Sequence, residues 1–195
     1  GRVLRVKFLD AGVAQVQIDA IMDAASEWTN YANLQFVVSS DDDAEVRITF
    51  LPQFICRSQI GTNALAIKPG QSTMTLGLFN GLELRPDYRR YVLHEFGHAI
   101  GCVHEQASPA IDIPWDKAKV YRYYKQLCGW DEMTVNHNIL MRYSKENVYF
   151  TTLHDPKSIM QYPIPKELTT GDFEIGWNTE LSENDKIFVS EIYPK

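Results

Sequence analysis

Three histidines stand at positions whose spacing suits a single metal ion. Residues 94–105 read H-E-F-G-H-A-I-G-C-V-H-E, with His94 and His98 four residues apart. Side chains four residues apart lie on one face of an α-helix, so these two imidazoles can bind one ion together. Glu95 follows His94 directly, where its carboxylate can reach a water molecule beside the ion. Two helical imidazoles and a neighbouring carboxylate are typical of a zinc hydrolase.

His104, the third histidine, can reach the same ion only if the helix ends before it. A straight helix would carry His104 about 15 Å beyond His94 along its axis. Gly101 lies between them, and glycine adopts the left-handed conformation that ends many helices. We therefore predict that a helix over 86–101 ends at Gly101 and that the chain then doubles back to present His104.

Three neutral imidazoles would leave one position on zinc for a water molecule, which distinguishes a catalytic zinc from a structural one. Zinc would lower the pKa of that water toward about 7. Glu95 would accept the proton as general base and return it to the leaving group, while zinc stabilises the oxyanion. The pattern thus predicts the metal ligands His94, His98 and His104 and the catalytic residue Glu95.

Cys102 lies inside this motif at a position that the pattern leaves free. A thiolate there could be a fourth zinc ligand, but a fourth protein ligand would close a catalytic site. We favour a buried structural thiol. The chain has three cysteines, and an odd number argues against a complete disulfide framework. A bridge between Cys56 and Cys128 stays open.

Two motifs carry a resemblance to a known family. At residues 94–105 the chain resembles the metzincin metalloproteases, and a glutamate directly after the third histidine, here Glu105, is similar to the astacin family of that clan. Residues 158–162, S-I-M-Q-Y, resemble the Met-turn of the clan, with the tyrosine of astacin-like members. The order and spacing of elements is similar over most of residues 3–193, and 106–115 looks closer to microbial relatives. The resemblance implies a zinc-dependent endopeptidase.

The resemblance also implies a fold. We expect an α+β, metzincin-type catalytic domain over 1–195, with a twisted, mixed five-stranded sheet and two long helices in an N-terminal subdomain of about 1–104. A C-terminal subdomain of about 105–195 would be mostly irregular and helical, with a cleft between the two. The substrate, a protein or peptide, would bind extended along an edge strand that lines the cleft, and 58–67 is the predicted edge strand.

Roles for three further residues come from the resemblance. Met160 would pack beneath the histidines. Tyr162 would bind the resting zinc through its hydroxyl and then swing away to hydrogen-bond the oxyanion, because a phenol both accepts and donates hydrogen bonds. The residue at the position of Glu105 pairs with the mature N-terminus in astacins. Here the first strand begins only about two residues after Gly1, so the segment before it is too short to assume that the N-terminus reaches Glu105. An internal donor for Glu105 is the alternative.

Composition narrows the partners and the location. The 195 residues carry a formal net charge of −6 at pH 7 with no cluster of Lys and Arg, so we expect no nucleic-acid partner. No apolar run approaches the roughly 20 residues of a transmembrane helix, so we expect no membrane partner. We also expect a monomer. The sequence reads as a mature or trimmed domain, and the resemblance implies a secreted protein made as a zymogen. The aspartates at 41–43 could help to bind calcium, but a solvated turn is simpler.

The remaining pattern predicts the elements that position the motifs. Alternating apolar residues predict strands over 3–9, 34–38, 46–50 and 73–78, besides 58–67. Apolar residues at helical spacing predict helices over 14–29, 115–127 and 182–193. Ser182 would cap the last of these. The predicted core positions of the last two helices are Trp115, Ala118, Tyr121, Tyr124, Ile187, Ile192 and Tyr193.

Two other functions would use the same residues. One is a catalytically inactive, zinc-stabilised module that captures peptides on its edge strand. Glu95 argues against this module, because holding zinc does not require that carboxylate. The other is a different hydrolase, such as a deacylase, against which the resemblances to an edge strand and a Met-turn argue. Cleavage preference cannot be derived from 163–166, where Lys166 would either favour an acidic substrate residue or be solvated.

Overall fold

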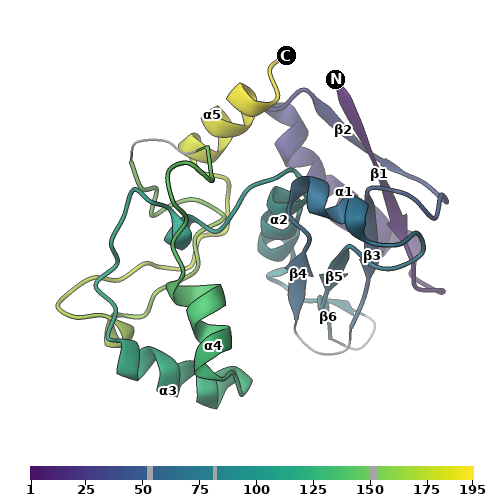
Figure 1. The fold of residues 1–195 in the computed structure, drawn as a ribbon. Coiled ribbons are helices and arrows are strands. Elements are labelled where there is room, and N and C mark those ends of the chain that lie inside the picture. Colours follow the sequence, from purple (N-terminus) through teal and green to yellow (C-terminus); the bar gives the residue numbers. More distant parts are fainter. Residues whose placement is uncertain (52–54, 81–82, 150–152) are drawn as a thin grey trace. The chain divides into compact units, whose positions relative to one another are not determined.

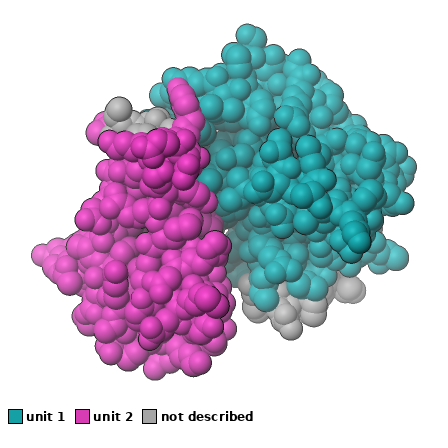
Figure 2. All heavy atoms as spheres, in the orientation of Figure 1, with its two compact units in different colours: residues 1–103, 179–195 teal, residues 104–178 magenta. Residues whose placement is uncertain are grey.

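The structure is a computed structural model that describes residues 1–51, 55–80, 83–149 and 153–195 (Figure 1). It divides into two compact units (Figure 2). The first contains Gly1–Val103 together with Thr179–Lys195, and the second contains His104–Asn178. The division after Val103 lies close to the predicted one. The last segment differs, because it was predicted with the second unit and belongs to the first.

A mixed five-stranded sheet forms the centre of the first unit, as predicted. Its strand order is β2-β1-β3-β5-β4, and β4 runs antiparallel to β5 while the other pairs are parallel. Leu4 and Val6 on β1 are buried on one face, as their alternation predicts. A small second sheet pairs β6 with β7. The bounds are β1 Arg2–Phe8, β2 Leu34–Val38, β3 Val46–Thr49, β4 Cys56–Ser58, β5 Met74–Leu76, β6 Phe79–Asn80 and β7 Glu83–Leu84.

The predicted strand over 58–67 is wrong for most of its length. Only β4, which ends at Ser58, is extended and forms the sheet edge, and Gly61–Ala66 is a 3-10 helix, η2. Gly61 begins this helix with φ +50, which an extended strand does not contain. A Cβ on Gly61 would lie 3.2 Å from the Cα of Gly101, so η2 approaches the end of the motif helix closely.

Three α-helices belong to the first unit: α1 Gln15–Ser26, α2 Tyr88–Ala99 and α5 Glu183–Ile192. The 3-10 helix η1, Glu27–Asn30, extends α1. Helix α2 carries the histidine motif and packs against α1, β4 and β5. The indole of Trp28 is fully buried, and its Nε1 donates to the carbonyl of Leu93 at 3.0 Å. Phe36 on β2 meets Phe96 edge to face at 4.9 Å. Helix α2 is therefore fixed from two sides of the core.

Helix α5 belongs to the first unit because of the residues around its end. Ser182 caps it, as predicted, and accepts from the Asp185 N–H at 3.0 Å. Ile187 and Ile192 were predicted to pack inward, but they are 52% and 41% exposed, and Val189 is buried instead. The Tyr193 carbonyl accepts from the backbone N–H of Asn33 at 2.8 Å. The two termini accordingly lie near each other (Figure 1).

The second unit is mostly helical and irregular, as predicted. It contains α3 Lys117–Cys128 and α4 Glu132–Val135, which a π-helical turn, Asn136–Leu140, continues. Two short 3-10 helices, η3 Glu105–Ala107 and η5 Lys166–Leu168, complete it. Helix α3 begins two residues later than predicted because the Asp116 carboxylate accepts from the Lys119 N–H and caps it. Ala118 is exposed, contrary to prediction, and Val120 is the buried position of this helix.

Four buried residues of the second unit form a small apolar core, separate from a second cluster of Ile113, Ile164 and Ile175. Val120, Val135, Ile139 and Leu168 are its fully buried members. Half-buried aromatic residues surround them, and Tyr162 is one of these. This core therefore reaches the segment that resembles a Met-turn.

Within the described residues, none of the three cysteines forms a disulfide. The bridge left open between Cys56 and Cys128 is therefore not present. Burial raises the pKa of the Cys56 thiol to about 12, with a further contribution from the Glu95 charge. The thiol consequently stays protonated at neutral pH. Among the described residues no helix has the length and the apolar character that crossing a membrane requires.

The acidic run at 41–43 is neutralised by cations of β1. Arg5 pairs with Asp41, Asp43 and Glu45 at 2.8–3.1 Å, and Lys7 pairs with Asp42 at 2.6 Å. These pairs favour the turn over a calcium site. Hydrogen bonds from Arg5 lower the pKa of Glu45 from its ordinary value of 4.5 to about 2. The ionised Glu45 thus stabilises the fold above pH 4.5, and this contribution is lost as the pH falls toward 2.

We predict that Glu45→Gln lowers the melting temperature by about 2–4 °C at pH 7, because an ion pair of this kind contributes modestly. The difference from the parent should shrink between pH 4.5 and pH 2 and vanish at the lower end. Melting followed by circular dichroism at several pH values measures it. Glu180→Gln removes an exposed carboxylate as a control and should show no such dependence. A difference that stays constant down to pH 2 would contradict the assignment.

Candidate functional site

The second half of α2 carries the two histidines and the glutamate of the motif, and all three side chains are buried. His94, Glu95 and His98 are only 2%, 4% and 5% exposed. The rings of His94 and His98 lie edge to face with centroids 4.7 Å apart, as the four-residue spacing predicts. Two imidazoles and one carboxyl group are therefore removed from bulk water by the packing of a single helix.

Helix α2 ends in a Schellman motif built on Gly101. The Gly101 N–H donates to the His98 carbonyl at 2.9 Å, and the Cys102 N–H donates to the Gly97 carbonyl at 2.9 Å. Gly101 has φ +106, a conformation that side-chain-bearing residues rarely adopt. Tyr193 adds to this end, since its hydroxyl donates to the Ile100 carbonyl at 2.7 Å. The prediction that the helix ends at Gly101 is confirmed.

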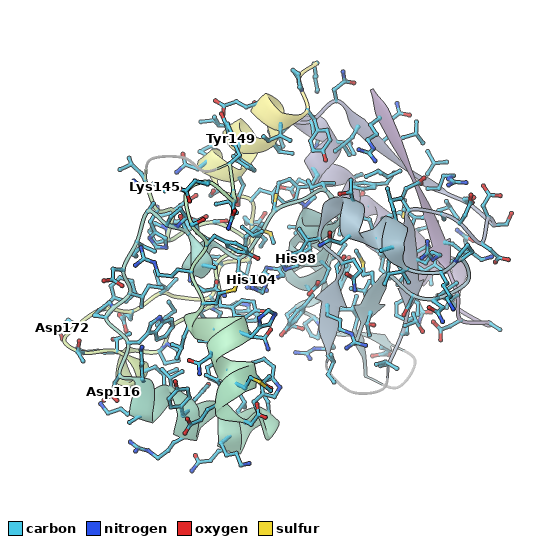
Figure 3. All side chains as sticks on the ribbon, in the orientation of Figure 1. His98, His104, Asp116, Lys145, Tyr149 and Asp172 are labelled. Atoms are coloured by element: carbon cyan, nitrogen blue, oxygen red, sulfur yellow. The ribbon has the colours of Figure 1, made fainter. Side chains whose placement is uncertain are left out.

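The turn brings the third histidine to the first two. One candidate ligand atom from each of His94, His98 and His104 lies within 4.8 Å of the others, and the side chains of His98 and His104 are labelled in Figure 3. In the described part of the chain this group contains three histidines and no cysteine. The thiol of Cys102 was predicted to be buried but is half-buried. The backbone N–H of Cys102 bonds to Gly97 in the turn, and its carbonyl lies beside Nδ1 of His98.

The histidines fit a zinc ion by their protonation and orientation. The Nδ1 of His98 lies 2.8 Å from the Cys102 carbonyl, so Nδ1 carries the proton. The lone pair of Nε2 is then available to bind a metal ion. Burial lowers the pKa of His98, which keeps the ring neutral as a metal ligand must be. The Nε2 atom of His94 is buried, and no described hydrogen bond reaches it. The donor set, three imidazole nitrogens, is one that zinc accepts.

Glu95 is held as a carboxyl group in a dry environment. Its Oε2 atom is buried and has no hydrogen-bond partner among the described residues. Burial raises the pKa of Glu95 to about 8, and the charge of Arg90 acts in the opposite direction. A carboxyl group with a raised pKa beside a metal-binding group has the properties of a general acid and base.

The segment that follows the motif is tied to residues 155–162. The Glu105 N–H donates to the Met160 carbonyl at 3.1 Å, and the Glu105 carboxylate accepts from the Asp155 N–H at 2.9 Å. Glu105 thus has an internal donor in this structure, which was the alternative to a partner at the N-terminus. Met160 is buried, with 3% exposed.

Tyr162 lies against the third histidine. The ring centroids of Tyr162 and His104 are 4.3 Å apart. The backbone N–H of Tyr162 donates to Oε1 of Gln106 at 3.2 Å. Gln106 was not predicted as a functional residue. The only available signal was its position directly after the histidine motif, which by itself specifies no role.

The other two histidines lie outside the group of three, and Lys166 is at the surface. His137 is exposed, and Nε2 of His154 lies 2.9 Å from Oε1 of Gln161. Neither belongs to the group of three histidines in the described residues. Lys166 pairs with Asp172, labelled in Figure 3, at 2.5 Å, and both side chains are well exposed. This ion pair agrees with a solvated lysine.

Comparison with known proteins gives one family. The chain matches two solved structures of myroilysin. The first has 36% sequence identity and a TM-score of 0.91, covering 99% of this chain and 93% of that one. The second has 35% identity and a TM-score of 0.70, covering 100% and 84%. No curated protein matches.

A third structure shows the same fold at greater distance. High choriolytic enzyme 1, a hatching enzyme zinc-protease from the medaka fish Oryzias latipes, is 16% identical with a TM-score of 0.66, and the match covers 98% of this chain and 88% of that one. The model of the astacin family of peptidases matches residues 5–193. Together with the three clustered histidines, these matches show that the chain belongs to the astacin family and is a zinc metalloendopeptidase.

Proposed function

We propose that this endopeptidase binds its zinc through His94, His98 and His104 and cleaves peptide bonds with Glu95 as general base. The observation that carries the proposal is the group of three ligand atoms within 4.8 Å of one another, with a buried carboxyl group adjacent in sequence. Three protein ligands leave a position open for water and substrate. Zinc bound there supplies Lewis acidity toward water and toward the substrate carbonyl.

Glu95 has the properties that the proton transfers require. Its Oε2 atom is buried and makes no hydrogen bond among the described residues, so this oxygen can accept a proton. A positive charge beside it would favour the carboxylate, which can then accept the proton of the attacking water. Because burial favours the protonated form, Glu95 can return that proton to the leaving amine. Burial therefore raises the pKa of Glu95, whereas a bound zinc ion would lower it.

Tyr162 is proposed as a further metal ligand and as a catalytic residue. Its ring packs on His104, which supports a position close to the ion. A phenol hydroxyl can bind the ion as an acceptor and can donate to the oxyanion when it leaves the ion. The substrate is proposed to bind extended along the edge strand β4, which is antiparallel to β5 and has no strand on its other side in the described sheet.

Family membership supports the wider setting of this activity. We propose a single catalytic domain that acts as a monomer on proteins or peptides outside the cell and is made as an inactive precursor. A peptide-capturing module without activity would have no need of Glu95. Substitution of that residue therefore distinguishes the two functions.

We predict that Glu95→Gln abolishes cleavage of a mixed peptide library, measured by mass spectrometry, while one zinc per chain is retained. The rate should fall by at least the factor of about 10²–10⁴ that a general base contributes. Glu132→Gln, at an exposed position of α4, is the control and should cut normally. Equal cleavage by Glu95→Gln would refute the role of Glu95, and a folded, zinc-loaded parent that cuts nothing would favour the inactive module.

We predict that Gly101→Ala weakens zinc binding at least tenfold, because the Schellman turn that presents His104 needs φ +106 at this position. Competition with a zinc chelator measures the affinity. Gly12→Ala is a matched control, since Gly12 also has positive φ and a Cβ on either glycine meets nothing within 4 Å. Both variants should lose stability, and only Gly101→Ala should lose zinc. Equal zinc affinity in the two would contradict the turn's role.

We predict that Tyr162→Phe lowers kcat by roughly 10–10³-fold with KM changed less than about threefold, as expected for loss of one oxyanion donor. The variant keeps the ring that packs on His104, so zinc content and melting temperature should stay close to the parent. Steady-state kinetics on one defined peptide provides the measurement. An unchanged kcat would remove Tyr162 from the catalytic residues without affecting Glu95.

A further inference from the structure

Two buried glutamine side chains hold the backbone of Tyr162. Oε1 of Gln106 accepts from the Tyr162 N–H at 3.2 Å, and Nε2 of Gln161 donates to the Tyr162 carbonyl at 2.7 Å. The two glutamines are 3% and 0% exposed. We call this pair of side chains, Gln106 and Gln161, the Tyr162 clamp. Both backbone polar groups of Tyr162 are thus bound by side chains from different parts of the second unit.

Each glutamine has its amide orientation fixed. The Tyr162 N–H requires an oxygen acceptor, so Oε1 of Gln106 must face it and Nε2 must point the other way. The Tyr162 carbonyl requires a donor, so Nε2 of Gln161 must face it. Oε1 of Gln161 is then available to accept from Nε2 of His154, which lies 2.9 Å away. His154 therefore fixes the Gln161 side chain of the clamp.

The side-chain amide of Gln106 is buried with only part of its hydrogen-bonding capacity satisfied. Its Nε2 atom is buried and has no hydrogen-bond partner among the described residues. A buried amide donor without a partner destabilises a fold, whereas an apolar side chain of similar length would fill the same space without that cost. In return Gln106 gains the hydrogen bond from the Tyr162 N–H.

The clamp fixes the point from which the Tyr162 side chain moves. With both N–H and C=O bound, the Cα–Cβ direction is set, and the hydroxyl can move only by rotation about the side-chain torsions. One side of the residue contacts His104, and the residue also packs on the apolar core of the second unit. The phenol is therefore placed by its backbone as well as by its ring.

We propose that Gln106 and Gln161 are positioning residues that hold the Tyr162 backbone so that its hydroxyl occupies a productive position beside the metal ligands. This inference rests on the proposed role of Tyr162 in catalysis. Neither glutamine touches the reacting atoms in this proposal, and each acts only through Tyr162. A displacement of a catalytic group by about 1 Å can lower the rate roughly 10²-fold, so loss of the clamp should be visible in kcat.

The test is a double-mutant cycle on the zinc-loaded protein. Gln106→Met keeps the length of the side chain and removes the acceptor, and we expect kcat to fall about tenfold with KM nearly unchanged. In the Tyr162→Phe background the same change should alter kcat by less than about twofold, because the hydroxyl that it positions is gone. Gln106→Glu retains an oxygen facing the Tyr162 N–H and should recover most of the rate. Gln161→Met replaces Gln106→Met if the latter does not fold.

A matched control separates positioning from general stability. Nδ2 of Asn178 donates to the carbonyls of Pro156 and Ser158 at 2.9 Å, in the segment that leads to Tyr162. Asn178→Leu should lower the melting temperature, and whatever effect it has on kcat should be the same with and without the Tyr162 hydroxyl. Equal, additive losses for Gln106→Met in both backgrounds would overturn the proposal.

Amide hydrogen exchange supplies a readout that does not depend on activity. The Tyr162 N–H should exchange at least tenfold faster in Gln106→Met than in the parent or in Asn178→Leu, with zinc content unchanged in all three. Unchanged exchange would overturn the clamp. Failure of the proposed function would appear separately, as equal activity of the parent, Glu95→Gln and Tyr162→Phe, whatever the exchange rate of Tyr162.

Discussion

The site depends on the way in which one helix ends. Helix α2 can align His94 and His98 by its own geometry, but it cannot bring His104 to them while it continues. The Schellman motif at Gly101 satisfies the last carbonyls of the helix and reverses the chain within a few residues. Tyr193, from the far end of the sequence, adds a hydrogen bond to Ile100 at the same place. The grouping of the three histidines is therefore a consequence of helix termination, and the Tyr193 hydrogen bond ties the last segment of the chain to this helix end.

Burial gives the residues beside this turn their chemistry. The same packing that removes His98 from water lowers its pKa and keeps it neutral, and it raises the pKa of Glu95. Both effects come from the cost of charging a group in a low-dielectric interior. Both directions suit the proposed roles, because a metal ligand must offer a lone pair and a general base must also be able to carry a proton. Trp28 and Phe96 help to pack α2 into the core where these residues are buried.

Side-chain hydrogen bonds play the corresponding part in the second unit. There the backbone forms little regular structure around residues 155–162, so its polar groups are satisfied by Glu105, Gln106, Gln161 and Asn178. Such an arrangement is rigid only while every member keeps its partner. Tyr162, which sits at its end and contacts His104, receives its position from these bonds and from the apolar core around Val120. Order in this unit depends on specific polar contacts, whereas order in the first depends on a sheet.

The sequence by itself determined the spacing of the histidine motif, the helix end at Gly101, the strands β1, β2 and β3 and the capped start of α5, because each follows from local periodicity or from one residue's conformational preference. It also indicated the family, whose fold the structure has. The extended reading of 58–67 failed because alternation there is weak and Gly61 requires a turn. Trp115, Tyr121 and Tyr124 pack against the core of the second unit, as predicted. Ala118 on α3 and Ile187 and Ile192 on α5 are exposed instead, because an apolar residue at helical spacing need not face the core. Only the tertiary structure decided that Tyr193 reaches Ile100, that Glu105 bonds to Asp155 and that Gln106 holds Tyr162. These contacts join residues far apart in the chain, and their partners are backbone groups, which every residue carries and no sequence pattern distinguishes.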